Sequence, residues 1–353
     1  MKIRSALLVA GLLAAFTAAA ETQTQRYIFK ANVSGLVGEA PAIYEFDSFT
    51  FDNCGQTGRV GPRLDDCLGR SNYANEEWTQ DPDLYSMETR GIQRWTVPAT
   101  GQYRIQAAGA RGGACCSNSA AGAIVEGVFR LQAGEVIQLL VGQRGSFDTS
   151  RARGGGGGSF VVTDGNEPLL VAGGGGSRAS AGRGRYQTEG RSGRGYGTNR
   201  IDYNGGSHGQ GGDGGRGFGG GGGFLTSGDG SSGADSFLEG GAGGRGRGSS
   251  NFHSASGGFG GGAGGGARSS VVQGAGGGGG YSGGGGARSS RNASAPRSGG
   301  GGSFISHLAL SASTGSGSYS HNSNAHEGYA GEVGSLSPSY NDGHGYIEIQ
   351  RLN

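Results

Sequence analysis

Short stretches of alternating apolar and polar residues recur along the chain and predict β-strands. The clearest pair flanks a turn at 98–101: Ile92, Trp95 and Val97 precede it, and residues 103–107 alternate between apolar and polar side chains after it. A period of two places one face of a strand in a core and the other in water. Further strands are predicted at 125–131, 136–141, 160–163, 169–172, 304–305 and 346–350. Because helical periodicity is nearly absent, we expect an all-β sandwich.

Glycine makes up 84 of the 353 residues, and its runs are bracketed by these strands. The run Gly154–Gly158 leads into the apolar residues at 160–162, and the strand at 169–172 leads into Gly173–Gly176. The last predicted strands follow the glycine region and must return to the same sandwich. We therefore divide the chain into a first part of the sandwich at 49–172, a glycine-rich insertion at 173–302, and C-terminal strands at 303–353.

Four interpretations of the glycine-rich insertion compete. It can be flexible coil, or an arginine–glycine nucleic-acid binder, as Arg183-Gly184-Arg185 and Arg245-Gly246-Arg247 suggest. A calcium-bound β-roll would require a nonapeptide repeat, which is missing. The fourth interpretation, which we favour, is a bundle of extended polyglycine helices with three residues per turn.

Such a bundle is marginally stable by itself. Ordering each backbone residue costs roughly 1–2 kcal/mol, and each hydrogen bond returns about 0.5–1.5 kcal/mol. The bracketing strands are therefore needed to hold the ends of the bundle. We expect Phe218, Phe224, Phe259 and Tyr281 to cap the bundle or line its outer surface.

The N-terminal residues have the features of an export signal. Lys2 and Arg4 precede an apolar stretch, and small residues end it at Ala20, so residues 1–20 are predicted to be a signal peptide. Residues 21–48 are expected to form an arm or one or two edge strands. Residues 70–90 are polar and acidic and are expected to form a surface loop, since their spacing fits no EF-hand calcium site. No later segment is apolar enough to predict a membrane span.

The charge of the chain limits its possible binding partners, and its cysteine content indicates disulfides. The formal charge is +2, and without Lys2 and Arg4 basic and acidic residues balance, which argues against a nucleic acid as partner. Four cysteines in an exported chain favour disulfides. A bridge between Cys54 and Cys67 would close a short loop and contribute about 3 kcal/mol. The adjacent Cys115 and Cys116 can form a vicinal bridge, pair with another chain or stay free, and the sequence does not decide among these.

Several stretches, in matching order from about residue 49 to the end, carry a family resemblance. They are Phe49–Gly55 with Gly61-Pro62 and Cys67, Gly91–Thr100, Gly127–Gly145, Leu170–Gly176, Gly302–Ser306 and Gly345–Ile349. The chain resembles the extracellular glycine-rich region of the anaplastic lymphoma kinase and leukocyte tyrosine kinase receptors, and related secreted glycine-rich proteins. The resemblance implies a TNF-like, jelly-roll-like antiparallel β-sandwich that carries polyglycine II helices, with Cys54 and Cys67 bridged.

Two properties of these receptors are not expected here. The receptors bind a small basic cytokine, partly through acidic residues just before the Ser-Phe-Ile segment, where this chain has Arg288, Arg291 and Arg297. Phosphoryl transfer needs a strand lysine and the His-Arg-Asp and Asp-Phe-Gly motifs. Lys30 is the only lysine beyond the signal segment, and neither motif occurs.

No other catalytic motif has a convincing context. Gly-x-Ser-x-Gly occurs at 205–209 and 280–284, as chance predicts in so glycine-rich a chain, and neither copy joins a strand to a helix. His326-Glu327 lacks the second histidine of a zinc protease, and the histidines share no metal-ligand spacing. We therefore expect no catalytic residues, no cofactor and no metal site.

These observations together predict a secreted, non-catalytic binding or adhesion module, extracellular or at the cell surface, or periplasmic in a Gram-negative host. Its partner is expected to be an unidentified protein or cell-surface ligand. The first alternative is a self-associating structural matrix or envelope protein. The second is a soluble, ligand-binding, receptor-like ectodomain.

Overall fold

The computed structural model describes residues 41–113, 120–148, 152–177, 203–247, 253–266, 272–290, 296–314, 333–335 and 341–352. The predicted signal segment 1–20, most of the segment 21–48, and both Cys115 and Cys116 lie outside these ranges. Of the helices in the described ranges, none has the length and apolar character needed to cross a bilayer.

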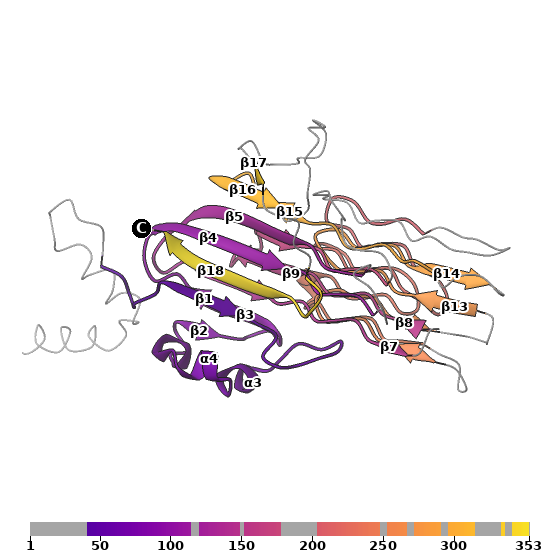
Figure 1. The fold of residues 1–353 in the computed structure, drawn as a ribbon. Helices are drawn as coiled ribbons and strands as arrows, with labels where there is room; N and C mark the ends of the chain where they lie inside the picture. Colours follow the sequence, from indigo (N-terminus) through magenta and orange to yellow (C-terminus); the bar gives the residue numbers. More distant parts are fainter. Residues whose placement is uncertain are drawn as a thin grey trace, which may run out of the picture.

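Two six-stranded sheets form the body of the protein (Figure 1). The first sheet has the order β1 (Ser48–Phe51), β18 (Tyr346–Leu352), β4 (Gly101–Ala108), β5 (Ile124–Leu131), β16 (Ser311–Thr314) and β17 (Val333–Ser335). The second has the order β15 (Phe304–Ile305), β10 (Pro168–Ala172), β9 (Ser159–Thr163), β6 (Val136–Leu140), β3 (Ile92–Thr96) and β2 (Tyr85–Ser86). Neighbouring strands are antiparallel, except that β16 and β17 run parallel. The predicted all-β sandwich is confirmed, and the TNF-like topology stays an expectation of the resemblance.

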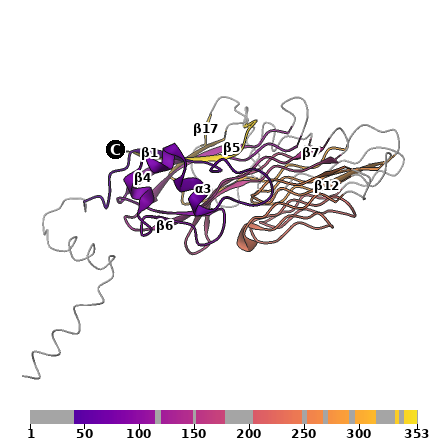
Figure 2. The ribbon, with the colours of Figure 1, turned by 90° about the horizontal axis from the view of Figure 1, so that it is seen from below.

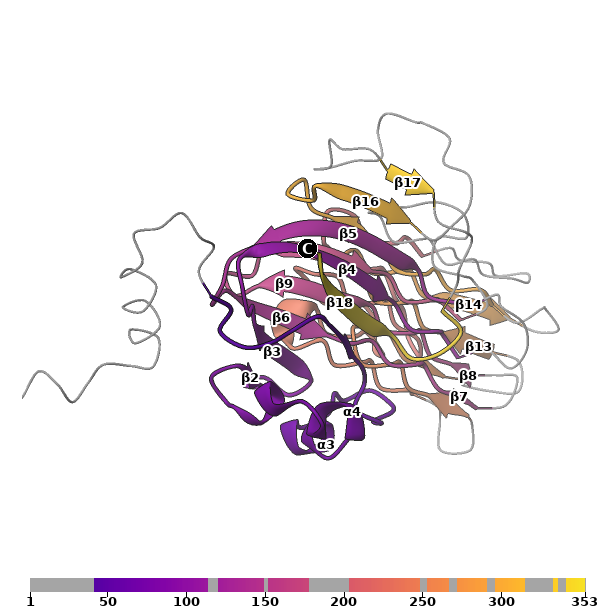
Figure 3. The same cartoon turned by 60° about the vertical axis from the view of Figure 1, so that its left-hand side comes forward.

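The core between the two sheets follows the alternation seen in the sequence. In β4, Tyr103 and Ile105 are fully buried, and Arg104 between them is only partly buried. Ile105 lies directly opposite Ile349 of β18, so both side chains point to the same face. Trp95 of β3 fills the core from the other sheet and is fully buried. Strands from distant parts of the chain therefore complete one sandwich, as Figure 3 shows for β18 beside β4.

A second apolar core covers the outer face of the β9-containing sheet. In β9, Val161 belongs to the first core, whereas Phe160 and Val162 belong to the second. The glycine-rich insertion supplies aromatic residues to this second core: Phe224, Phe237 and Phe259. Phe237 packs between Phe160 and Phe224, with ring centroids 5.2 and 5.3 Å away.

The aromatic residues that we expected to cap the bundle or line its outer surface are buried or partly buried, so they do not face water. Phe218, Phe224 and Phe259 are each at most 4% exposed, and Tyr281 is partly buried against Phe304. The physical reason is the apolar outer face of β9, which needs cover, and the aromatic rings of the insertion provide it. The insertion is anchored to the sandwich by its side chains.

The glycine runs are joined by backbone hydrogen bonds with a repeat of three. In the run 276–281, every third amide donates to the same neighbouring segment, at N–O distances of 2.9–3.3 Å. The amides of Gly276 and Gly279 donate to the carbonyls of Arg153 and Gly156, respectively. In the same way, Gly277 and Gly280 donate to Gly219 and Gly222, and Gly278 and Tyr281 donate to Gly299 and Gly302. The acceptors in each segment are therefore also three residues apart.

The run 219–224 shows the same repeat with neighbours of opposite direction. Gly219 and Gly222 bond to Gly264 and Gly261, Gly220 and Gly223 to Asp229 and Thr226, and Gly221 and Phe224 to Gly284 and Tyr281. A backbone that sends successive amides to three different neighbours, and repeats every third residue, has the symmetry of a polyproline-II-type helix. The pattern supports the predicted polyglycine helices, and their conformation stays a prediction.

Short strands of the insertion pair with one another and with short strands at 147–153. A four-stranded sheet has the order β14 (Ala287–Ser290), β13 (Val272–Ala275), β8 (Ala152–Arg153) and β7 (Phe147–Asp148), and a small pair joins β11 (Ser254–Ala255) to β12 (Gly265–Gly266). Figures 1 and 2 place β7 toward one end of the molecule and the short helices toward the other. The limits proposed for the parts of the chain remain predictions.

The segment 70–90, which we expected to be a surface loop, contains two short helices and a short strand. The helices are α4 (Ser71–Ala74) and the 3-10 helix η1 (Glu77–Gln80), with α3 (Leu64–Leu68) before them and β2 after them; a second 3-10 helix, η2 (Phe237–Glu239), lies in the insertion. Tyr73, Trp78 and Tyr85 are buried and hold the intervening polar residues in short turns. These three aromatic residues carry no helical periodicity, so the sequence did not predict the short helices.

The described part of the N-terminal segment is an arm. Residues 41–47 contain no strand, and β1 begins at Ser48. Phe46 packs against Trp95 with ring centroids 5.1 Å apart, and Tyr44 stacks on Trp78 at 5.5 Å. The arm is therefore fixed to the sandwich by its aromatic side chains.

Candidate functional site

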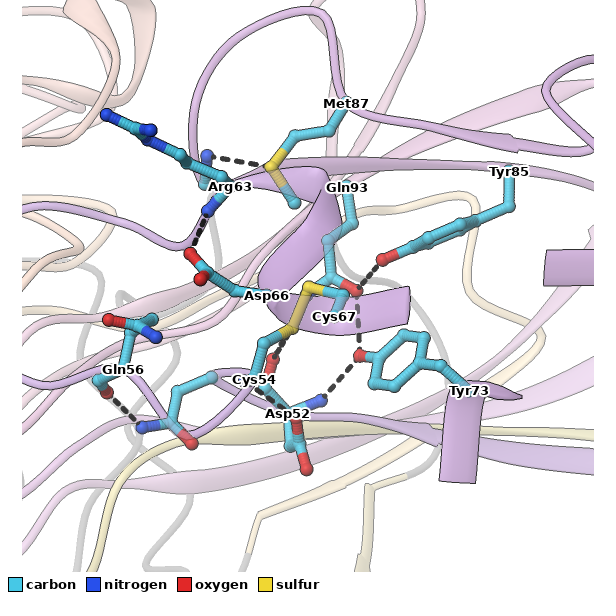
Figure 4. The surroundings of a disulfide bond; sticks show 12 residues. Asp52, Cys54, Gln56, Arg63, Asp66, Cys67, Tyr73, Tyr85, Met87 and Gln93 are labelled. Carbon is cyan, nitrogen blue, oxygen red and sulfur yellow. Dashed lines mark hydrogen bonds between the residues drawn. A yellow bond between two sulfur atoms is a disulfide. The ribbon is translucent and has the colours of Figure 1, made fainter. Parts of the chain in front are cut away.

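The cysteines that the resemblance paired, Cys54 and Cys67, form a disulfide (Figure 4). Both are buried, and Cys67 lies on α3. The backbone N–H of Cys54 donates to Asp52 Oδ1 at 2.7 Å, which is an Asx-type turn and accommodates the positive φ of Cys54. The bridge joins the end of β1 to the helical segment, so its position indicates a structural role.

A buried polar network lies beside the disulfide and is centred on Gln93. Its Oε1 accepts hydrogen bonds from the hydroxyls of Tyr73 and Tyr85, each at 2.8 Å, and its Nε2 donates to the Asp52 carbonyl at 3.0 Å. Burial raises the pKa of both phenols well above their ordinary value. Both hydroxyls therefore remain protonated donors, and the network fastens the helical segment to β3.

The other sequence candidates do not assemble into a reactive centre. Cys115, Cys116 and His326 lie outside the described residues. Ser282, from one Gly-x-Ser-x-Gly motif, is fully buried and its Oγ accepts from the Gly209 amide at 3.1 Å. In the described ranges, no cluster of three or more His, Cys, Asp or Glu residues is arranged to hold a metal ion.

A surface cavity of about 280 Å³ lies where η2 of the insertion meets the β9-containing sheet. Its apolar wall is formed by Ile92 of β3 with Phe237 and Leu238 of η2. Ile92 and Phe237 are buried, whereas Leu238 is 47% exposed. The cavity exists because the insertion packs on the sandwich, so residues from two distant parts of the chain line it.

The polar wall of the cavity is organised around Arg94. Its Nη1 lies 2.7 Å from Asp164 Oδ1, and its Nε lies 3.4 Å from Glu88 Oε1. The Arg94 side chain is 20% exposed, and the two carboxylates are more than half exposed. Such exposed pairs contribute little to stability, but they fix the orientation of the guanidinium toward the cavity.

Two amide side chains complete the polar wall. Gln138 Nε2 donates to the Thr163 carbonyl at 3.0 Å and to Asn166 Oδ1 at 3.1 Å. Asn166 has a positive φ of 62°, a conformation that asparagine tolerates in tight turns. The Gln138 carbonyl oxygen and the Asn166 amide nitrogen bond to no other described residue and are available to a ligand.

This arrangement offers both donors and acceptors of hydrogen bonds to a ligand. The cavity lining contains no cysteine, histidine, serine or lysine, and its charged side chains are Glu88, Asp164 and Arg94. Arg94 forms ion pairs with both carboxylates, so these three side chains together carry one negative charge. One feature of the cavity is visible in the sequence, the turn at 163–166 between two predicted strands. The part played by η2 was missed because it depends on tertiary packing.

The chain is similar to part of a known receptor. It is 38% identical over 100 residues to the leukocyte tyrosine kinase receptor of Mus musculus. This match covers 28% of the chain and 11% of the receptor, so the chain spans about a tenth of that relative's length. No protein-family model matches the chain. The comparison supports a region similar to the leukocyte tyrosine kinase receptor.

Proposed function

We propose that the protein is an extracellular, non-catalytic binding or adhesion module that resembles part of a receptor. The similarity to the leukocyte tyrosine kinase receptor supports a receptor-like role. The disulfide between Cys54 and Cys67 fits an oxidising compartment, as does the predicted signal segment at 1–20. The cavity at Arg94 offers hydrogen-bonding groups to a ligand.

The observation that carries this proposal is the continuous hydrogen bonding between the glycine runs and the sandwich. The disulfide-closed loop takes part: the amide of Gly243 donates to the Arg59 carbonyl at 2.7 Å, and the Phe259 amide to the Gly58 carbonyl at 2.8 Å. Arg59 Nε returns a bond to the Gly243 carbonyl at 2.8 Å. We infer that the insertion serves as a stiff spacer, which presents the sandwich and its cavity to a partner.

Binding is tested with the purified secreted chain, labelled with a fluorophore and incubated with intact cells of its host. We expect saturable binding that excess unlabelled protein displaces. The control is the same chain after reduction, alkylation and denaturation, which has the same composition without the fold. Binding that does not saturate, or purified protein that turns over small substrates, would overturn the proposal.

The stiff spacer has a separate test, amide hydrogen exchange followed by mass spectrometry. We expect slow exchange at 219–224 and 276–281, where the amides bond to neighbouring glycine segments. Exchange at the rate of a free peptide in both runs would show a flexible tether, and the spacer role would be abandoned.

A further inference from the structure

The polar atoms of the cavity at Arg94 point to the kind of ligand that fits. On the acceptor side are the second carboxylate oxygens of Glu88 and Asp164 and the carbonyl oxygen of Gln138. On the donor side are Asn166 Nδ2 and Arg94 Nη2. Among the described residues, neither the Gln138 carbonyl oxygen nor Asn166 Nδ2 has a hydrogen-bond partner. A ligand must therefore accept and donate hydrogen bonds over a short distance.

Hydroxyl groups meet this requirement better than charged groups. A hydroxyl donates one hydrogen bond and accepts two, so neighbouring hydroxyls can satisfy a carboxylate and a guanidinium together. An anionic ligand would face both Glu88 and Asp164, and a cationic ligand would lie beside the Arg94 guanidinium that pairs with them. Because side chains of both signs line the cavity, a charged ligand of either sign would meet a like charge, which favours a neutral ligand.

Size and shape narrow the ligand further. The volume of about 280 Å³ lies below the roughly 300–1,000 Å³ of sites for drug-sized molecules. The apolar wall formed by Leu238 with Ile92 and Phe237 offers contact to a ligand face that lacks hydroxyls. A pyranose ring has both properties, since its hydroxyls point outward around the ring and its C–H groups form an apolar face.

We propose that the cavity at Arg94 binds one neutral sugar residue, such as the terminal hexose of a cell-surface glycan. This inference rests on the proposed function and names the ligand class of the same module. Asp164 and Arg94 would bind the ring hydroxyls, Asn166 would donate to a ring or hydroxyl oxygen, and Leu238 would contact the C–H face. The ligand would hold η2 and the sheet together, because groups from both line the cavity.

The test is a titration of the secreted chain, labelled at isoleucine and leucine methyl groups, followed by NMR. The sugars are glucose, galactose, mannose and N-acetylglucosamine, with glucuronate and glucosamine as the anionic and cationic comparisons. We expect at least one neutral sugar to shift the methyl signals of Ile92 and Leu238 with a Kd on the order of 1 mM, the range for so small a ligand. Leu308, an exposed leucine that does not line the cavity, serves as the internal control.

Two variants locate the site. Asn166→Gly keeps the positive φ and removes the amide, and Asp164→Asn removes the charge that orients Arg94. We expect each to weaken binding at least tenfold, while Asn75→Ala, an exposed change outside the cavity, leaves it unchanged. Binding that both cavity variants retain would overturn the proposal, because the sugar would then bind elsewhere.

The remaining outcomes are also decisive. Shifts with glucosamine or glucuronate but with no neutral sugar would overturn the assignment of a neutral ligand. Absence of shifts with every sugar, at concentrations well above the expected Kd, would overturn it altogether. If the labelled protein still binds cells saturably in that case, the proposed function stands and only the sugar assignment fails.

Discussion

Replacing Gly277 by alanine tests whether the glycine bundle holds the fold together. A Cβ atom at this position would lie 1.9 Å from the Gly284 carbonyl oxygen and 2.9 Å from the Gly221 amide nitrogen. Both contacts are to backbone, so no side-chain rotation relieves them. To reach an ordinary contact the segments must separate by roughly 1.5 Å.

The cost of this separation follows from the hydrogen bonds around Gly284. Its amide donates to the Gly278 carbonyl at 2.8 Å, and its carbonyl accepts from the Gly221 amide at 2.8 Å. Each bond contributes about 0.5–1.5 kcal/mol, and each buried polar group left without a partner costs about 1–3 kcal/mol. We therefore expect Gly277→Ala to lower the free energy of unfolding by about 3–5 kcal/mol, a large part of the typical stability of a domain.

The assay is urea unfolding, compared with the matched variant Gly165→Ala. At Gly165, in the turn after β9, an added Cβ meets only Thr163 Oγ1 at 3.8 Å, an ordinary contact. Both variants reduce the entropy of the unfolded chain alike, so their difference reports the folded state. We expect a much lower urea midpoint for Gly277→Ala, with faster amide exchange at 219–224 and 276–284. Equal midpoints and unchanged exchange would refute close packing of the glycine backbones.

Three further predictions address the rest of the fold. The double variant Cys54→Ala/Cys67→Ala should lose about 3 kcal/mol of unfolding free energy in calorimetry. Wild type with the bridge reduced should lose a similar amount. A double variant as stable as oxidised wild type would contradict a stabilising bridge. Burial and, to a smaller extent, the charge of Arg144 lower the pKa of His344 in the folded protein. The unfolded state therefore takes up a proton at higher pH than the folded state, and the free energy of unfolding should fall as the pH drops through the ordinary histidine range. The fall should be less steep in His344→Asn, and parallel pH profiles of the two proteins would contradict this role. Gln93→Leu should lower the free energy of unfolding by about 3 kcal/mol, because it removes the acceptor of two buried tyrosine hydroxyls. The control Gln102→Leu, at an exposed position, should change this free energy by no more than about 0.5 kcal/mol. Equal melting temperatures of the two variants would count against a stabilising role of the network.

The sequence determined the strands because a period of two is a local property. The alternation around Tyr103 and Ile105 predicted β4, and the distant segment at 346–350 predicted the strand that pairs with it. The sandwich followed, since both segments have one apolar face to bury. The strand-bracketed glycine runs likewise predicted an insertion that is fastened at its ends.

The tertiary structure alone decided where the aromatic residues of the insertion lie. Phe224 and Phe259 stand in glycine-rich sequence with no periodicity, so nothing local showed whether they face water or a core. They are buried because the outer face of β9 carries Phe160 and Val162, which need cover. The helical turns at 64–80 were missed for a similar reason, since three scattered aromatic residues fix them by long-range packing.

The cavity at Arg94 also depends on contacts between distant parts of the chain. The sequence shows Arg94, Asp164 and Leu238 as unrelated polar and apolar residues. They meet because antiparallel pairing brings the β9–β10 turn toward β3 across β6, and because the aromatic core places η2 over the sheet. Local patterns determined which segments extend and which faces are apolar, whereas long-range packing decided which side chains share a site.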